Sequence, residues 1–219
     1  HTDLRRMISG ILNIPSSIKF PLNVRIIGAI NIDETTHYLS PKILDRAHIM
    51  KFDSPLLFDW TQIADEIEEN ENKNLKIKFT IEELGLRDPY PSFDKDNLFC
   101  QIITSFTKSY FQPLGIEVGL RTIRQGLNYQ NIYKEQESNE NLVLNNFILH
   151  KILPKMTFDW KKKVDENRSK EDILLEFQRV LKDNIDENLV NSKSVSVINE
   201  LDEIITASRS NDGIVNYWA

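Results

Sequence analysis

The sequence has little of what several protein classes require. It contains one cysteine among 219 residues, Cys100, so an internal disulfide and a cysteine-rich metal centre are both excluded. The four histidines are far apart and form no metal-ligand pattern. No run approaches the roughly 18 consecutive apolar residues that a membrane helix needs, and the N-terminus lacks the build of a signal peptide. We therefore expect a cytoplasmic protein with no metal site of its own and no membrane partner.

The composition predicts a folded core. Apolar residues make up 40% of the chain and charged residues 27%, a balance typical of globular proteins. The formal net charge is −6, so the overall field disfavours nonspecific binding to nucleic acid or to an anionic membrane. Any site for an anion must depend on a local group of basic residues.

The first part of the chain is expected to be an α/β piece, residues 1–58. Residues 24–32, VRIIGAINI, form a near-continuous run of branched apolar residues, which predicts a central strand buried on both faces. Ser40 and Pro41 predict the start of a short helix, SPKILDRA, because serine caps helices and proline suits the first helical position. Residues 48–52, HIMKF, predict a short strand.

The rest of the chain is expected to be mainly helical. Residues 59–94 form a connector with a possible helix and a short strand. Residues 95–219 carry apolar side chains at three- and four-residue spacing, which places them on single helix faces. This pattern predicts five helices, followed by a tail, GIVNYWA, that is apolar enough to dock on some other surface. The expected fold class is mainly α with a small α/β portion.

Several of these segments resemble one protein family. NVRIIGAINIDETTHYLSPKILDRAHIMKF is similar to the stretch around the sensor-1 strand of McrB-type AAA+ nucleotide triphosphatases. GLRTIRQGLNY resembles their sensor-2 helix, and FILHKILPK and GIVNYWA resemble their lid and C-terminal end. The resemblance implies a partial AAA+ α/β core with the sensor-1 strand and the arginine-finger helix, followed by an α-helical lid.

The family's functional residues map onto four positions of this sequence. Asn31 would be the sensor-1 residue that positions the attacking water or touches the terminal phosphate. Arg46 would be the arginine finger that reaches the nucleotide of the neighbouring subunit. Arg121 would be the sensor-2 arginine, and Arg124 lies one turn further on the same helix face. Arginine suits these roles because its planar fork pairs with two phosphate oxygens.

Alternatives remain open for each of these residues. The run GAINIDE also resembles a Walker B strand, in which Asp33 would bind magnesium and Glu34 would polarise water, although Gly28 and Asn31 interrupt the apolar run. In the favoured register, Asp33 and Glu34 lie in a loop near the subunit interface. Asn31 alone could cap a turn.

The charged residues have simpler explanations as well. Asp45 and Arg46 could form a local surface ion pair of little energetic value. Arg121 and Arg124 could belong to an ordinary solvated helix face.

One expected motif is missing. None of the seven glycines is followed by lysine, so the sequence has no G-x-x-x-x-G-K-[ST] loop to hold nucleotide phosphates. The chain also begins at His1 without an initiator methionine, which favours a fragment that is inactive alone. The parent protein would bind Mg²⁺ with ATP or GTP, associate into a ring, and act with a nuclease or DNA in restriction or defence. The competing hypothesis is a helical protein-interaction module that binds no nucleotide.

Overall fold

The computed structural model describes residues 2–13, 15, 26–30, 39–52, 68, 94–136, 140–186 and 195–218. The chain divides into two compact units. One comprises His1–Ile30 and Ser54–Pro89, and the other comprises Asn31–Asp53 and Tyr90–Ala219. Residues 39–52, which we grouped by sequence with the α/β piece, thus belong to the same unit as the helices.

The described part of the first unit contains one helix, α1 (Thr2–Leu12). Its apolar residues lie on one face, as their three- and four-residue spacing dictates. All of them are exposed, and the helix buries no residue.

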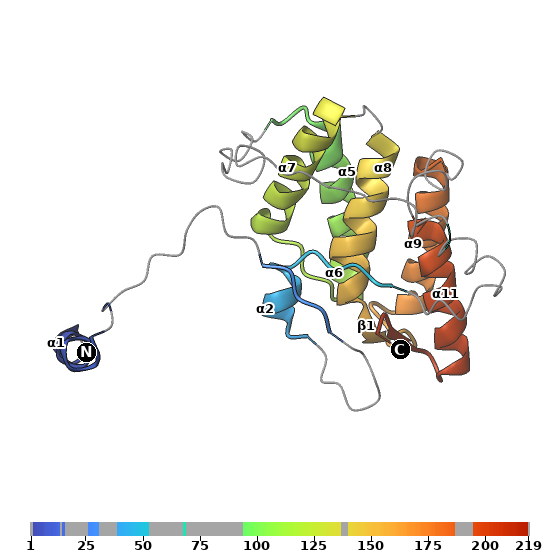
Figure 1. Ribbon diagram of the computed structural model, residues 1–219. Helices are drawn as coiled ribbons and strands as arrows, with labels where there is room; N and C mark the ends of the chain where they lie inside the picture. The colour runs from blue at the N-terminus through green and yellow to red at the C-terminus, as the bar shows by residue number, and fades with distance from the viewer. Residues whose placement is uncertain are drawn as a thin grey trace. The chain divides into compact units, whose positions relative to one another are not determined.

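The second unit is built from helices with one small sheet (Figure 1). Its elements in chain order are α2 (Pro41–Leu44), α5 (Leu98–Phe106), the π-helix η2 (Thr107–Phe111), α6 (Gln112–Leu114), α7 (Leu120–Gln136), α8 (Glu140–Phe147), the π-helix η3 (Ile148–Ile152), the 3₁₀-helix η4 (Leu153–Lys155), β1 (Thr157–Asp159), α9 (Lys170–Asn184), α11 (Val197–Ser210) and β2 (Ile214–Asn216). We call residues 94–218 of this unit the helical domain.

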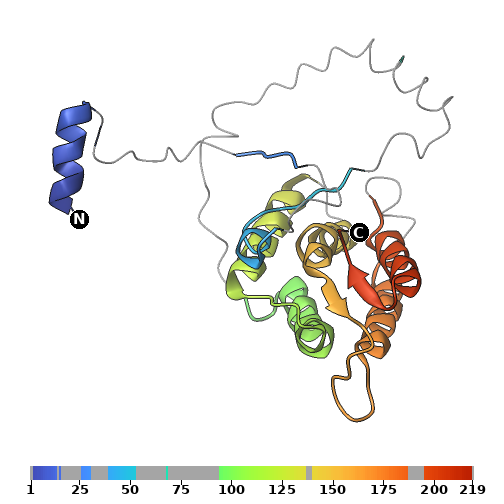
Figure 2. The same ribbon diagram turned by 90° about the horizontal axis from the view of Figure 1, so that it is seen from below.

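The continuous rod α8–η3 forms the centre of the helical domain. Figures 1 and 2 show it with α5 and α7 on one side and α9 and α11 on the other. Because other helices surround it, most of its residues are buried, and Phe147, Ile148 and Ile152 are fully buried. The aromatic rings of Phe106, Phe111 and Phe177 pack edge to face beside this rod, so α5, η2 and α9 share one core.

Local signals in the sequence fix the helix ends. Asn97 caps α5 by accepting a hydrogen bond from the Cys100 amide at 3.0 Å. Ser169 and Asp172 form a reciprocal capping box at the start of α9. Gly115 ends α6 with a φ of 88°, a left-handed conformation that glycine adopts without strain.

The apolar C-terminal tail docks as a strand. β2 pairs antiparallel with β1, so that Phe158 faces Val215 in the register. Val215 and Tyr217 are buried, and Trp218 donates its indole N–H to the Pro154 carbonyl at 3.1 Å. The predicted docking is therefore confirmed, but the sequence did not indicate β1 as its partner.

The expected central strand at residues 24–32 is absent from its described part. Residues 26–30 have no strand pairing, and Ile26 and Ile27 are 81% and 97% exposed. An apolar run of this kind becomes a strand only where neighbouring strands supply hydrogen bonds and a covered face. Within the described residues, only β1 and β2 form a sheet, and they lie in the other unit.

The expected strand at residues 48–52 is also wrong. This stretch is irregular, and a single pair of contacts with His150 replaces the ladder of a sheet. The preceding short helix is confirmed as α2, with Pro41 in its first turn. Ser40 occupies the cap position, but its side chain makes no capping hydrogen bond.

The helices predicted from residue 95 onward are confirmed, so the fold is mainly α. Not every apolar residue of these helices faces the core, because Ile132 on α7 is 47% exposed. Cys100 is half-buried against the core. Among the described helices, none is both long and apolar enough to cross a membrane.

Candidate basic site at Asp45 and Arg121

The candidate site forms where α2 meets the first turn of α7. Asp45 follows the last residue of α2, and Arg121 is the second residue of α7, so the two segments are distant in sequence. The Arg121 guanidinium donates to one Asp45 carboxylate oxygen at 3.1 Å, and the Thr122 hydroxyl donates to the other at 2.9 Å. The Lys155 ammonium lies 3.5 Å from that second oxygen.

The π-helix η3 holds the backbone of the same turn. Lys151 donates to the carbonyl oxygens of Asp45 and Ala47 at 3.1 and 2.6 Å. Those carbonyls are at the end of α2, where a helix leaves acceptors without partners and where a positive charge is favourable. The residue is only 3% exposed, so its ammonium is committed to this turn. We call Asp45, Arg121, Thr122, Lys151 and Lys155 the Asp45 cluster.

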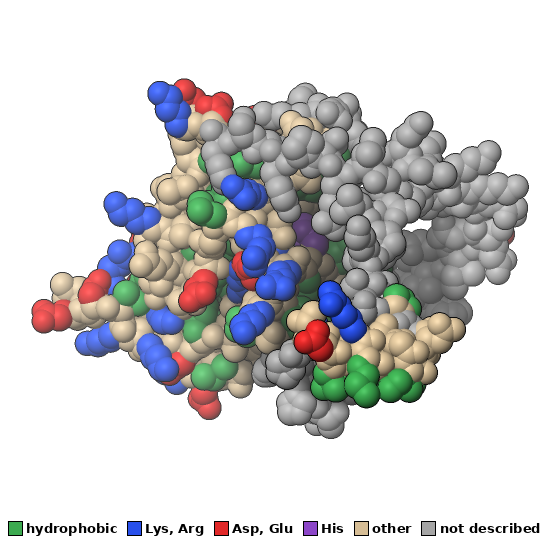
Figure 3. Space-filling view, turned by 90° about the vertical axis from the view of Figure 1, so that its left-hand side faces the viewer, with side chains coloured by type: hydrophobic (Ala, Val, Ile, Leu, Met, Phe, Trp, Pro, Cys, Tyr) green, Lys and Arg blue, Asp and Glu red, His purple; other side chains and the backbone are tan. Residues whose placement is uncertain are grey.

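Figure 3 shows the face that this arrangement creates. Lys and Arg side chains gather there around an acidic side chain. With Arg121, Lys151 and Lys155 around it, Asp45 is the negative centre of a group that carries more positive than negative charge. An anion that approaches this face is therefore attracted.

The Asp45 carboxyl is held in its charged form. Burial alone would raise its pKa, but the Thr122 hydroxyl, the Lys155 charge and the Arg121 guanidinium outweigh burial, and the pKa lies below its ordinary value. The carboxylate is therefore ionised at neutral pH and available as an ion-pair partner.

Burial acts in the opposite direction on the two lysines. Burial and, to a smaller extent, the Lys155 charge lower the pKa of Lys151 to about 8, against the attraction of Asp45. Burial also lowers the pKa of Lys155, again against the attraction of Asp45. Two ammonium groups close together thus depend on one carboxylate for compensation.

Further contacts hold residues 39–52, which we call the strap, along the helical domain. The His150 ring Nδ1 donates to the Ile49 carbonyl at 2.7 Å, and the Ile49 amide donates back to the His150 carbonyl at 3.2 Å. Burial lowers the pKa of His150, so the neutral ring is favoured. Lys51 reaches Glu200 on α11 at 3.0 Å. The strap is therefore fixed along residues 45–51, at Asp45, Ala47, Ile49 and Lys51.

The structure leaves all three predicted arginines exposed. Arg46 follows Asp45 directly, is exposed, and forms no ion pair with any described residue. Arg121 keeps 56% of its side chain exposed although it is paired, and Arg124 is exposed as well. Asn31, Asp33 and Glu34 lie outside the described residues.

One of the alternatives is corrected by these contacts. Asp45 does not form the expected local pair with Arg46, because its two oxygens are directed to α7 and η4. This pairing spans 76 residues of sequence, so it ties the strap to the helical domain and is not a local surface pair.

The sequence interpretation missed Thr122, Lys151 and Lys155. A signal for the lysines exists in the segment FILHKILPKM, where Lys151 and Lys155 lie four residues apart in an otherwise apolar stretch. A lysine in such a stretch is buried only where acceptor groups pair with its ammonium. Two such lysines therefore predict a site at which acceptors from another segment meet them. No comparable signal singles out Thr122.

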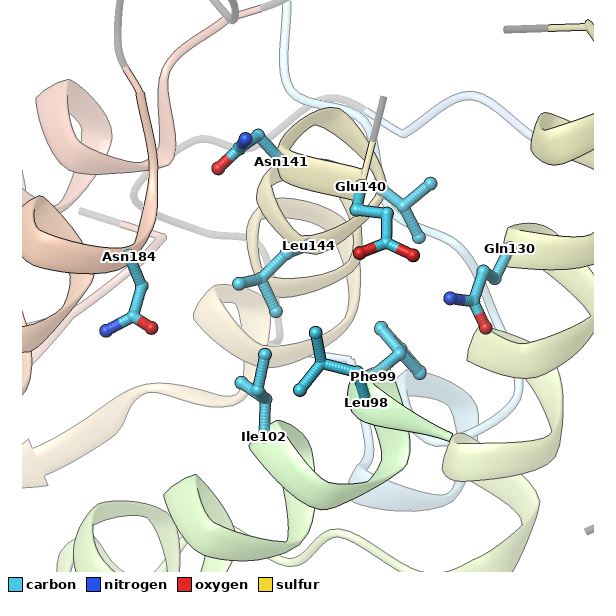
Figure 4. A pocket seen from close by; sticks show the side chains of 9 residues that line it. Leu98, Phe99, Ile102, Gln130, Glu140, Asn141, Leu144 and Asn184 are labelled. Atoms are coloured by element: carbon cyan, nitrogen blue, oxygen red, sulfur yellow. The ribbon is translucent and has the colours of Figure 1, made fainter. Parts of the chain in front are cut away.

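A pocket elsewhere in the helical domain does not contain these residues. Figure 4 shows it between α5, α7, α8 and the end of α9. It is lined by Leu98, Phe99, Ile102, Gln130, Glu140, Asn141, Val143, Leu144 and Asn184. The lining includes no lysine or arginine, so this pocket offers nothing that would pair with phosphate. Among the described residues, no three metal-ligand side chains lie together.

Comparison with known proteins gives one match. The family described as Domain of unknown function (DUF8727) matches residues 94–213, more than half of the chain. The chain belongs to this family. The DUF8727 region begins three residues before the Asn97 cap of α5 and ends at the turn before β2, so it coincides with the helical domain. No curated protein and no solved structure matches the chain.

The DUF8727 boundaries divide the Asp45 cluster. Arg121, Thr122, Lys151 and Lys155 lie inside the matched region, whereas Asp45 precedes it. The family model therefore covers the part of the cluster on the helical domain and excludes the strap.

Proposed function

We propose that this chain supplies the arginine finger and the lid side of a nucleotide site in a ring-forming AAA+ triphosphatase of the McrB type. In this proposal Arg46 reaches the phosphates bound by a neighbouring subunit, and Arg121 contacts those bound by its own subunit. Asn31 supplies the sensor-1 amide. The phosphate-binding loop comes from polypeptide outside this sequence.

One observation carries the proposal. The contact between Asp45 and Arg121 brings the segment that carries Arg46 next to the start of α7, and both arginines are exposed. Phosphoryl transfer depends mainly on positioning and on the neutralisation of charge, and arginines supply both. A packed Arg46 would have removed the basis for a finger.

The described residues suit phosphate oxygens and not the metal ion. The Asp45 cluster has one carboxylate, and that carboxylate is already paired with three groups. Mg²⁺ prefers several oxygen ligands and its own water molecules. On this proposal Mg²⁺ enters with ATP or GTP and is held by residues outside the cluster.

The proposal is tested by hydrolysis in the parent polypeptide. The coding sequence upstream of His1 is examined for a phosphate-binding loop and an acidic strand end, and the longer protein is then assayed with Arg46→Ala. We expect nucleotide binding to be largely retained and the hydrolysis rate to fall about 10³-fold or more. Arg209→Ala, at an exposed arginine on α11, is the control and should hydrolyse normally. An unchanged rate in Arg46→Ala would remove the finger assignment.

The second candidate is a helical protein-interaction module, and the DUF8727 match favours it. The family model matches residues 94–213 and therefore includes no part of the proposed α/β core at residues 1–58. A reading frame that begins at or near His1 would support this module and contradict the nucleotide proposal. A nuclease or DNA partner remains part of the first proposal only.

A further inference from the structure

We propose that Arg121 forms an ion pair with Asp45 while no anion is bound, and that a polyphosphate anion replaces Asp45 as the partner of Arg121. Asp45 itself stays in place. The inference rests on the proposed function, because it concerns the regulation of the same site. The exchange would make Asp45 an internal competitor for the anion.

The three partners of the Asp45 side chain differ in how firmly they are held. Thr122 is fully buried, and the Lys155 side chain is only 10% exposed. The Arg121 side chain is 56% exposed. Because solvent and salt screen an exposed ion pair, the Arg121 contact is the weakest of the three.

The release of Arg121 leaves no group without a partner. One Asp45 oxygen keeps the Thr122 hydroxyl and the Lys155 ammonium, and the other faces solvent, because 29% of the side chain is exposed. Lys155 also donates to the Glu117 carbonyl at 2.9 Å, which fixes its position. The carboxylate therefore remains compensated when Arg121 moves away.

Asp45 cannot follow Arg121 to the anion. Its carbonyl oxygen accepts a hydrogen bond from the buried Lys151, and the Ala47 carbonyl is bound to the same ammonium. The turn is thereby clamped to η3. The only mobile member of the pair is the arginine side chain, whose long apolar stem allows the head to swing.

The chemistry favours a multiply charged anion over a carboxylate. A phosphate chain presents several charged oxygens and can pair with both ends of the guanidinium fork, whereas Arg121 reaches one oxygen of Asp45. Since a ligand shifts an equilibrium by its differential affinity, the competing carboxylate lowers the apparent affinity of the site.

The test is a calorimetric titration of the chain with inorganic tripolyphosphate. Asp45→Asn keeps the shape of the side chain and its ability to accept from Thr122, but it removes the charge that holds Arg121. We expect about two- to fivefold tighter binding, the range that an exposed ion pair contributes. Asp202→Asn removes the same charge from the exposed Lys182–Asp202 pair and is the matched control. In Asp45→Asn combined with Arg121→Gln, the gain should disappear.

Each other result decides against the exchange. Binding by Asp45→Asn that is equal to or weaker than wild type overturns it, and so does a gain that Asp202→Asn reproduces or that survives Arg121→Gln. If Asp45→Asn does not fold, Asp45→Ser takes its place with the same expected gain. Arg121-dependent binding that ignores Asp45 removes only the exchange. An absence of tripolyphosphate binding in wild type and all variants also overturns the exchange, whereas the finger assignment is decided separately by the hydrolysis rate of Arg46→Ala in the longer protein.

Discussion

Lys151 both stabilises the end of α2 and has a lowered pKa, because its ammonium is buried there. Its ammonium is buried beneath the turn that carries Asp45 and satisfies two carbonyls there. The contact stabilises the turn, yet burial of the charge has a cost that appears as a pKa of about 8. The residue that fixes the site therefore also carries a charge that burial disfavours.

The pH dependence of folding should report this lysine. The unfolded chain keeps the proton up to about pH 10.5, whereas the folded chain releases it near pH 8. Between these values the unfolded state binds more protons, so the free energy of unfolding rises with pH, by about 3 kcal/mol. Lys151→Met should lack this rise, as measured by urea unfolding at pH 8 and 10.5. Lys182→Met, at an exposed lysine on α9, should keep it.

At the scale of elements, the close contact of α7 with α5 and α8 depends on a glycine. A methyl group at Gly126 would lie 2.6 Å from the Phe99 ring and 2.8 Å from the Phe147 ring. Those two rings already pack edge to face at 5.1 Å, so neither can move freely. The first turn of α7, which carries Arg121, is positioned by this packing.

Gly126→Ala should therefore destabilise the helical domain. Alanine favours a helix over glycine by about 1 kcal/mol, but overpacking against two rings costs about 1–3 kcal/mol, so we expect a net loss. Thermal unfolding followed by circular dichroism measures it. Gly119→Ala, where an added methyl group meets nothing within 4 Å, is the matched control. Equal stability of the two variants would show that α7 does not pack as described.

The helices could be predicted from the sequence better than the strands, for a physical reason. A helix satisfies its own backbone, so the spacing of apolar residues at Phe99, Ile103 and Phe106 suffices to locate it. A strand depends on neighbouring strands for its hydrogen bonds, and no described residue pairs as a strand with residues 26–30 or 48–52. The π-turns of η2 and η3 left no sequence signal, although η3 presents His150 and Lys151 to the strap.

At the scale of the whole molecule, a few charged contacts attach the strap to the helical domain. Lys51 is the contact of the strap with α11, and it neutralises Glu200, whose side chain is 7% exposed. The Lys51 ammonium also lies 5.9 Å from the centre of the Tyr217 ring in the docked tail. Strap, helix and tail therefore meet at one ion pair. The sequence places these partners 149 residues apart, so spacing alone could not predict the pair.

Lys51→Met should weaken this attachment through the group it leaves behind. The buried Glu200 carboxylate would lose its cation, and a loss of about 2 kcal/mol is expected, less than for a fully buried pair because Lys51 is partly exposed. Glu200→Gln in the same chain removes the stranded charge and should restore most of the stability in urea unfolding. Failure of this rescue would mean that Lys51 acts by packing alone.

The candidate site could be predicted only in part. Arg46, Arg121 and Arg124 followed from a family resemblance, but the buried lysines and the pairing of Asp45 with Arg121 required the fold. That pairing joins residues that no local pattern relates, because long-range contacts depend on how helices pack.

The most direct measurement of the central claim is an NMR titration of the arginine side chains with tripolyphosphate. Assigned Nε–H signals of the chain report which guanidinium groups meet the anion. The account predicts saturable shifts at Arg46 and Arg121, and none beyond ionic-strength effects at Arg209 on α11. Uniform shifts at all arginines, or no saturable shift at Arg121, would contradict the phosphate-facing site.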